Sequence, residues 1–398
     1  MKLAPLTLYS LAAVFEIAGS SGAAMLAPFF MKAHGYSIAA VGVPLAVNGL
    51  GRVCSDLTSG VLASYFSSGM LLVAASTAAL AVSVVSIYFL DSTAYFLGAF
   101  TILGFAEAMF ALSIRKIAFE QSEPGQQGRA QGQVASALGI GFSIGPLLGG
   151  FVGKTFGPDA LFAVYAVPQL IGLVLILLGG AHRSRAITQE KSAQLWREGK
   201  KLLSQPWFLA TSLAAFQTFA MLVGVTRIAF PFLAVNQHGF GLDWVGTAVS
   251  ISRLTDTFGR YTGGRLCDRI TAPRVILLGV GIGIPMFVAQ PYGWETLTLV
   301  IPLTIMTMGF GYTNVGATTL ALQSSGSQAK ALALGLTRAS MSLGNGLGPL
   351  IAGALLQKFG YGMGYQAMAG LSGIVLLFTW WGLKRRLAGA AIESDRPL

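Results

Sequence analysis

The stretch GIGFSIGPLLGG, residues 139–150, has Gly or Pro at half of its positions, although it lies inside a long apolar run. In water this composition favours a loop, because Gly inside a helix costs about 1 kcal/mol and Pro about 3 kcal/mol relative to Ala. The surrounding residues 132–153 carry no charge, and at about 1.5 Å per residue they are long enough to cross the hydrocarbon core of a bilayer. In lipid the backbone must stay helical, and small residues let a second helix approach closely. We therefore predict a transmembrane helix with a flat face of small residues.

The composition of the whole chain indicates a membrane protein. Hydrophobic residues make up 54% of the 398 residues and charged residues 10%, with a mean hydropathy of +0.67, whereas soluble domains carry roughly 25% charged residues. Apolar windows predict an all-α protein with twelve transmembrane helices between residues 5 and 383. The first window is long and contains Glu16, so we interpret it as a span and not as a cleaved signal. The two cysteines predict no disulfide framework.

The distribution of Lys and Arg predicts the orientation of the chain in its membrane. With the N-terminus inside, the cytoplasmic segments hold eighteen of these residues, whereas the outer loops hold only Lys32, Lys154 and Lys358. This asymmetry follows the positive-inside rule and predicts a multi-pass protein of the cytoplasmic (inner) membrane with both termini in the cytoplasm. The net charge of +11 is then explained by topology and anionic lipid, and we expect no nucleic-acid partner.

An internal repeat divides the chain into two halves. The Gly and Pro pattern of residues 132–150 recurs at 335–353, an offset of 203, and KTFG ending at Gly157 recurs with the same offset as QKFG ending at Gly360. Such matches in register indicate duplicated six-helix bundles, an arrangement common among secondary transporters. We expect bundles at residues 1–181 and 208–384, a basic cytoplasmic linker at 182–207 and a cytoplasmic tail at 385–398.

These features resemble the major facilitator superfamily, and the likeness extends over nearly the whole chain. The fifth-span pattern matches the antiporter motif of the twelve-helix drug:proton branch, and GGRLCDRITAPR keeps Gly264, Asp268, Arg269 and Arg274 of the family's loop motif. In the first half, Ser64 stands where the loop motif has Asp. The fourth-span Arg of proton-coupled drug exporters is also missing from LGAFTILGFAEAMF. The resemblance implies the major facilitator fold and alternating access more directly than it implies the drug exporters' proton mechanism.

Ionisable residues inside the spans are the candidates for function, because a charge in a bilayer is expensive and rarely kept without use. Glu16 and Glu107 lie near the expected midplane, where a carboxyl can take up and release a proton as its surroundings change. Arg52 and Arg253 either contact substrate or partner those carboxylates, and both alternatives stay open. For Arg260 and Asp268, near the inner surface, we favour ion pairs that hold helices together.

The candidate residues fall into four groups. The proton-coupling candidates are Glu16, Glu107, Asp56 and Asp256. The substrate-binding candidates are Arg52, Arg253, Arg227, Gln217 and Asn314. The gating candidates are Asp56, Arg338, Asp268, Arg269, Arg129 and Arg260. The packing motif consists of Gly141, Gly145, Pro146, Gly149, Gly344, Gly348 and Pro349.

The sequence predicts a proton-coupled secondary transporter that exports a small amphipathic organic compound by antiport. The alternative is proton-coupled symport or exchange of an organic anion, which five intramembrane arginines against four acids favour. A membrane-embedded enzyme or a receptor is a third hypothesis, against which the duplicated halves and the lack of a catalytic constellation argue. We expect no enzyme activity, no metal, no cofactor beyond a proton gradient, and a monomer whose partners are its substrate and the bilayer.

Overall fold

The computed structural model describes residues 5–89, 92–122, 127–180, 202–323 and 330–394, and it contains helices and no strands within these ranges. By their packing the residues form two compact units. Unit 1 consists of residues 1–189 and 230–254, and unit 2 of residues 190–229 and 255–398. This division passes through one helix of the second half, whereas the sequence predicts a single bundle over 208–384. Most of the expected linker, residues 182–201, lies outside the described residues.

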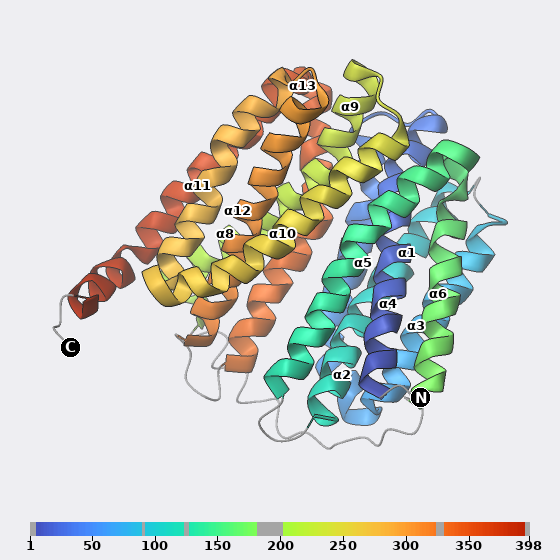
Figure 1. The fold of residues 1–398 in the computed structure, drawn as a ribbon, viewed down its shortest axis with the longest axis horizontal. Coiled ribbons are helices and arrows are strands. Elements are labelled where there is room, and N and C mark those ends of the chain that lie inside the picture. Colours follow the sequence, from blue (N-terminus) through green and yellow to red (C-terminus); the bar gives the residue numbers. More distant parts are fainter. Residues whose placement is uncertain (1–4, 90–91, 123–126, 181–201, 324–329, 395–398) are drawn as a thin grey trace. The chain divides into compact units, whose positions relative to one another are not determined.

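Long helices follow one another with short connections (Figure 1). The helices up to residue 180 are α1 (Pro5–Ala33), α2 (Val43–Tyr65), α3 (Ser68–Ser86), α4 (Thr93–Glu120), α5 (Gln127–Phe156) and α6 (Leu161–Leu178). Those that follow are α8 (Pro206–Gly224), a π-helical turn (Val225–Ala229), α9 (Phe230–His238), α10 (Leu242–Ile270), α11 (Ala272–Ala289), α12 (Thr296–Gln323) and α13 (Lys330–Ser394). Short 3-10 turns occupy Ala40–Gly42, Pro158–Ala160 and Gln290–Tyr292.

The internal repeat is visible in the helix boundaries. Helices α4 and α12 both contain 28 residues and begin 203 residues apart, at Thr93 and Thr296. Gly157 follows α5 with φ 82° and ψ 171°, and its counterpart Gly360 has φ 72° and ψ −179° inside α13. This backbone region is essentially restricted to glycine. The Gly shared by KTFG and QKFG is therefore required where the chain turns from one helix into the next.

Nine helical segments of the described residues are long and apolar enough to cross a membrane. One of them, Leu332–Lys384, contains two expected spans joined at Gly360. Helix α2, which carries Arg52 and Asp56, and helix α10, which carries Arg253, Asp256 and Arg260, are not among the nine. These two points account for the difference from the twelve spans expected, and the fold is that of an all-helical multi-pass membrane protein.

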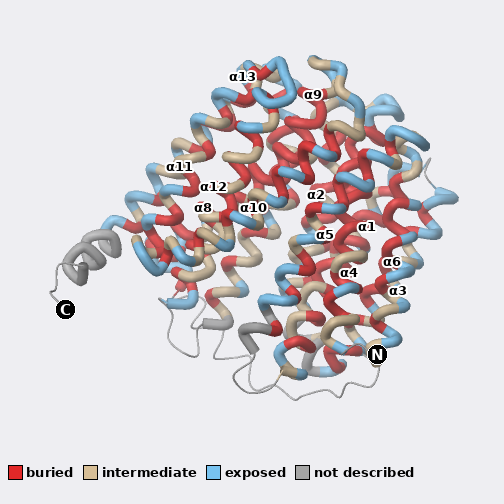
Figure 2. Tube along the Cα trace, in the orientation of Figure 1, coloured by how far each residue is buried: buried red, intermediate tan, exposed pale blue. Residues whose placement is uncertain are grey.

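Helix α1 lies between α5 and α6 in unit 1 (Figure 1) and is buried along most of its length (Figure 2). Large apolar side chains on other helices are exposed, among them Phe151 on α5 and Val167 on α6. Extended exposed apolar surface is unusual for a soluble monomer. In a bilayer these side chains contact lipid, and the enclosed α1 is placed to carry polar groups away from it.

Small residues bring α5 against α1. A Cβ atom on Gly145 would lie 2.7 Å from the Ala18 carbonyl oxygen, and one on Gly141 would lie 2.8 Å from the Val14 carbonyl oxygen. Both distances are far below van der Waals contact, so no side chain fits at either glycine. The Gly-rich face quoted above is the surface on which α1 packs.

The equivalent contact in unit 2 joins α13 to α8. A Cβ atom on Gly348 would lie 2.6 Å from the Ala220 Cα, and one on Gly344 would lie 2.9 Å from the Ala220 amide nitrogen. In both copies of the Gly pattern, the glycines thus lie directly against the backbone of the neighbouring helix.

Helix α5 also contacts the first turns of α10 within unit 1. A Cβ atom on Gly150 would lie 3.0 Å from the Gly246 Cα. Beyond this contact the Lys154 ammonium lies 2.8 Å from the Asp243 carboxylate, in a pair that is largely exposed. The ammonium holds the pKa of Asp243 below its ordinary value.

Candidate functional site

Glu107 on α4 is the centre of a buried polar cluster in unit 1. Its carboxylate lies 2.7 Å from the Arg52 guanidinium of α2, and its side chain is 7% exposed. The Tyr165 hydroxyl on α6 donates to Oε1 at 2.6 Å, and the Ser20 hydroxyl on α1 donates to the same atom. Hydrogen bonds from a cation and from hydroxyls favour the charged form of a carboxyl. All three groups donate to Glu107, so the arrangement stabilises it as a carboxylate.

Glu16 on α1 is equally buried but has different surroundings. It is 3% exposed, and its Oε1 has no hydrogen-bond partner among the described residues. None of the ion pairs found in the described part of the chain includes Glu16. An ionised carboxylate in such a place costs several kcal/mol unless it is paired. The two carboxyls therefore differ in their surroundings: Glu107 accepts from a guanidinium and two hydroxyls, whereas Glu16 has no cation partner in the described residues.

Glycine makes room for the Glu16 side chain. A Cβ atom on Gly172 of α6 would lie 2.8 Å from Glu16 Cγ and 3.1 Å from Glu16 Oε1. One helical turn before Gly172, the Gln169 amide donates to the Glu16 backbone carbonyl at 3.5 Å. Helix α6 thus presents a glycine and an amide to the carboxyl-bearing turn of α1.

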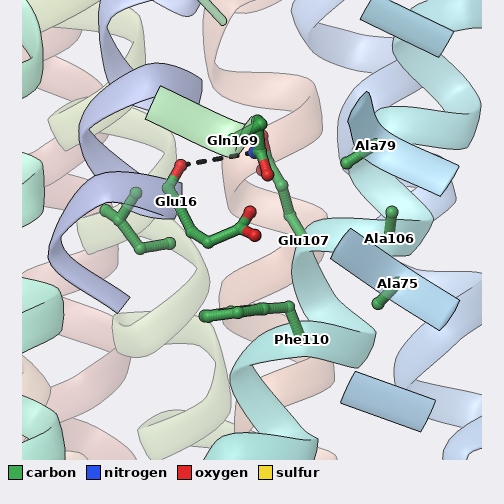
Figure 3. Close-up of a pocket in the computed structure, with 8 residues that line it drawn as sticks. Glu16, Ala75, Ala79, Ala106, Glu107, Phe110 and Gln169 are labelled. Atoms are coloured by element: carbon green, nitrogen blue, oxygen red, sulfur yellow. Dashed lines mark hydrogen bonds between the residues drawn. The ribbon is translucent and has the colours of Figure 1, made fainter. Parts of the chain in front are cut away.

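A small cavity separates Glu16 from Glu107. It is lined by three polar side chains, Glu16, Glu107 and Gln169, and by the apolar residues Ile17, Ala75, Ala79, Ala106 and Phe110 (Figure 3). The Glu16 carboxyl points into the space between the helices in this view. The cavity volume is about 10 Å³, close to the minimum that accommodates one water molecule.

Two charged residues of α10 form an ion pair within the helix. Arg260 lies 2.6 Å from Asp256, four residues earlier, and this carboxylate is buried. Arg253, one turn before Asp256, is 7% exposed and belongs to unit 1. Asp256 is thus the ion-pair partner of Arg260.

The remaining substrate-binding candidates lie on helices of unit 2. Gln217 on α8 donates to the Ser372 hydroxyl at 2.8 Å, and its amide oxygen is buried without a partner in the described residues. Arg227 lies in the π-helical turn after α8, and Asn314 is half-buried on α12. Single π-helical turns interrupt helices frequently at functional sites. The three candidates thus lie on separate elements of unit 2.

The gating candidates are spread over both units. Asp56 is half-buried on α2 of unit 1, whereas Arg338 is half-buried on α13 of unit 2. Asp268 and Arg269 are exposed near the end of α10. Arg129 is in the first turn of α5, and its side chain lies outside the described residues. The latch between Asp56 and Arg338 stays a prediction.

Three polar residues of the site were missed by sequence reasoning, namely Ser20, Tyr165 and Gln169. Helix α6 contains no charged residue, so a search for ionisable groups inside the spans does not identify it. Tyr165 and Gln169 are nevertheless four residues apart in an otherwise apolar helix, so they share one face. That spacing was the available signal. In the described residues no group of three or more His, Cys, Asp or Glu side chains could hold a metal.

Solved structures with the same arrangement of helices belong to transporters. The nucleoside transporter NupG has 14% sequence identity and a TM-score of 0.79, with 96% of this chain and 100% of that chain covered. A bacterial homologue of the human lysosomal transporter Spinster has 14% identity and a TM-score of 0.78, with 95% and 96% covered. The peptide transporter POT, in complex with sulfate, has 11% identity and a TM-score of 0.76, with 96% and 94% covered.

At these identities the likeness shows the fold alone. A comparison of the sequence with curated proteins found no match. The family model of the Major Facilitator Superfamily, however, matches residues 9–336. That match covers most of the chain, which therefore belongs to the Major Facilitator Superfamily, a family of multi-pass membrane transporters and not of enzymes.

Proposed function

We propose that the protein is a proton-coupled transporter that exports a small amphipathic organic compound by antiport. The observation that supports proton coupling is the difference between two buried carboxyls a short distance apart. Glu107 has a guanidinium and two hydroxyls as partners, whereas Glu16 has no cation and an oxygen without a partner. Only the second arrangement suits a group that must exist in both protonation states.

Glu16 is the proton carrier in this proposal. Its side chain is buried where α1 packs against α6. There it is stable as a neutral acid, because a carboxylate without a cation partner is unfavourable in a low-dielectric interior. When alternating access admits water to α1, hydration stabilises the carboxylate and the proton leaves. Substrate and proton then bind alternately in the open cavity, and the proton gradient drives export of the substrate.

Glu107 and Arg52 have a fixed electrostatic role in the same proposal. Their ion pair keeps a negative charge near Glu16 and aligns α2 with α4. Removing one partner of a buried pair leaves an uncompensated charge and costs about 3–5 kcal/mol. Asp56 and Asp256 are the next candidates for the proton if Glu16 does not carry it.

The alternative is symport or exchange of an organic anion. It is favoured by the five arginines of the helix interiors, of which Arg253 is 7% exposed. A planar guanidinium binds carboxylate or phosphate through two parallel hydrogen bonds. In this alternative Arg52, Arg253 and Arg227 contact the anion, and Gln217 and Asn314 supply neutral hydrogen bonds.

The remaining proposals concern placement and gating. We place the protein as a monomer in the inner membrane with both termini in the cytoplasm. Two interactions close its inner side: Asp56 with Arg338, and Asp268 with the start of α5 around Arg129. Arg260 and Arg269 support this closure from α10.

A binding screen on the purified protein tests the substrate class. Unfolding temperatures are measured with ethidium as an amphipathic cation, an uncharged nucleoside, a dipeptide, and a set of organic acids. The nucleoside and dipeptide are included because similar folds belong to transporters of nucleosides and of peptides. A ligand of the folded state raises the unfolding temperature in proportion to its occupancy. Antiport of amphipathic compounds predicts stabilisation by ethidium, whereas stabilisation by organic acids alone would favour the anion alternative.

Transport of the stabilising compound in vesicles then tests coupling. An imposed pH gradient should drive accumulation by the wild type and not by Glu16→Gln, which should still exchange substrate for substrate. Glu107→Gln is the matched control, because it neutralises the other carboxyl of the same cavity. If Glu16→Gln still accumulates the compound in response to the gradient, the proton is carried elsewhere.

A further inference from the structure

The cavity between α1, α3, α4 and α6 contains a mismatch of hydrogen-bonding groups. Glu16 Oε1 and Gln169 Oε1 are both buried, and neither has a partner among the described residues. Both residues line the cavity (Figure 3). When Glu16 is ionised, its oxygens and the amide oxygen can only accept hydrogen bonds, so they cannot satisfy each other.

The orientation of the Gln169 amide follows from its other contact. Its Nε2 faces the Glu16 backbone carbonyl at 3.5 Å. A carbonyl only accepts, so rotating the amide by half a turn would set two acceptors against each other. The amide oxygen is thereby left as a second acceptor beside the carboxyl, and the cavity needs a donor of two hydrogens whenever Glu16 is ionised.

One water molecule satisfies this requirement in both size and chemistry. The cavity of about 10 Å³ is near the smallest that holds a water, and a buried water makes about 2–4 hydrogen bonds to groups that would otherwise be unsatisfied. Water donates two hydrogens and accepts two. The Ser76 hydroxyl on α3 lies near enough to act on the Glu16 carboxyl, although its geometry falls short of a regular hydrogen bond, so it is a third group that such a water can bond.

We propose that this cavity is a binding site for a single water molecule, which bridges Glu16 and Gln169 and serves Glu16 in both of its protonation states. When Glu16 is ionised, the water donates one hydrogen to its carboxylate and the other to Gln169 Oε1. When Glu16 is neutral, the acid hydrogen is donated to the water oxygen and the water turns. A fixed cation, which only donates, could not reverse in this way.

The groups around the cavity explain why the water serves Glu16 and not Glu107. Glu107, on α4, already accepts from Arg52 of α2, Tyr165 of α6 and Ser20 of α1. One of these donors is a guanidinium, which can only donate. Glu16 has no cation partner in the described residues. The inference therefore rests on the proposed role of Glu16 and adds the molecule that lets this residue change charge in place.

A structure of the full-length protein at a resolution that shows ordered water tests the site directly. We expect one density peak within hydrogen-bonding distance of Glu16 Oε1 and Gln169 Oε1. A cavity without a peak would overturn the inference. A sodium ion would also overturn it, and it would be recognised by an unfolding temperature that rises in NaCl but not in KCl of equal ionic strength.

Matched variants test the hydrogen bond spectroscopically. Ala79→Val fills the cavity with methyl groups, and Ala79→Thr has the same shape with a hydroxyl in place of one methyl. The infrared carbonyl band of protonated Glu16 should move to higher frequency in Ala79→Val, because the acid loses its acceptor, and should stay near the wild-type position in Ala79→Thr. Ala99→Val, buried on α4 away from the cavity lining, is the control and should leave the band unchanged.

These results are separable from those for coupling. If Glu16→Gln retains coupled transport but the density peak is present, the proposed function fails and the water site stands. If coupling depends on Glu16 and the cavity shows no peak, the water site fails and the proposed function stands.

Discussion

Removing the Tyr165 hydroxyl measures whether Glu107 is ionised in the folded protein. In Tyr165→Phe the hydrogen bond of 2.6 Å to Glu107 Oε1 is lost, while the ring, which is 2% exposed, keeps its packing. Hydrogen bonds to charged groups contribute about 1.5–3 kcal/mol, against about 0.5–1.5 kcal/mol for neutral pairs. Ser20 still donates to the same oxygen, so we expect a loss of about 1.5–2 kcal/mol in the free energy of unfolding.

Tyr9→Phe is the matched control. Tyr9 is 1% exposed, and its hydroxyl also donates at 2.6 Å, but to the carbonyl of Gly179, a neutral acceptor. Equilibrium unfolding of both variants in mixed detergent micelles at neutral pH should show a loss about 1 kcal/mol larger for Tyr165→Phe. Equal losses would mean that Glu107 is neutral, and they would refute the assignment of fixed charge to Glu107.

Three further predictions concern the rest of the chain. Leu at Gly145 or Gly348 should abolish transport and lower the unfolding temperature, because either side chain would meet helix backbone; wild-type transport in both variants would contradict the packing role. Paired cysteines at Asp56 and Arg338 should crosslink in an outward-facing state and separate in an inward-facing one, and equal crosslinking in both states excludes the latch. The pKa of Asp243 is lowered, so its ion pair stabilises the fold at pH values above the ordinary carboxyl pKa and weakens as the pH falls below it. Asp243→Asn should therefore have a lower unfolding temperature than the wild type at neutral pH. The difference in unfolding temperature between the two proteins should shrink below about pH 4.

The overall fold could be predicted from the sequence because membrane constraints are local and strong. Apolar windows locate the helices, and the repeat at an offset of 203 relates Gly157 to Gly360, both of which have positive φ. The number of segments that are apolar enough to span was less predictable. Arg52 and Asp56 lower the hydropathy of α2 even though it is a long helix.

The candidate site could be predicted only in part. Burial cost identifies Glu16 and Glu107 from the sequence, but their different surroundings depend on which helices are neighbours. Gly172 and Gln169 belong to a helix without charges, and the sequence contains no direct sign that they face Glu16. The division of roles between the two carboxyls comes from contacts between α1, α4 and α6, which hydropathy and spacing do not specify.

The most direct test of the account is the location of the titrating proton. Infrared spectra of the purified protein are recorded across a pH titration for the wild type, Glu16→Gln and Glu107→Gln, and the carbonyl band of a buried carboxylic acid is followed. The account predicts that the wild type shows a band that titrates, that Glu16→Gln lacks it and that Glu107→Gln retains it. A titrating band that persists in Glu16→Gln and disappears in Glu107→Gln would contradict the claim that Glu16 carries the proton while Glu107 stays charged.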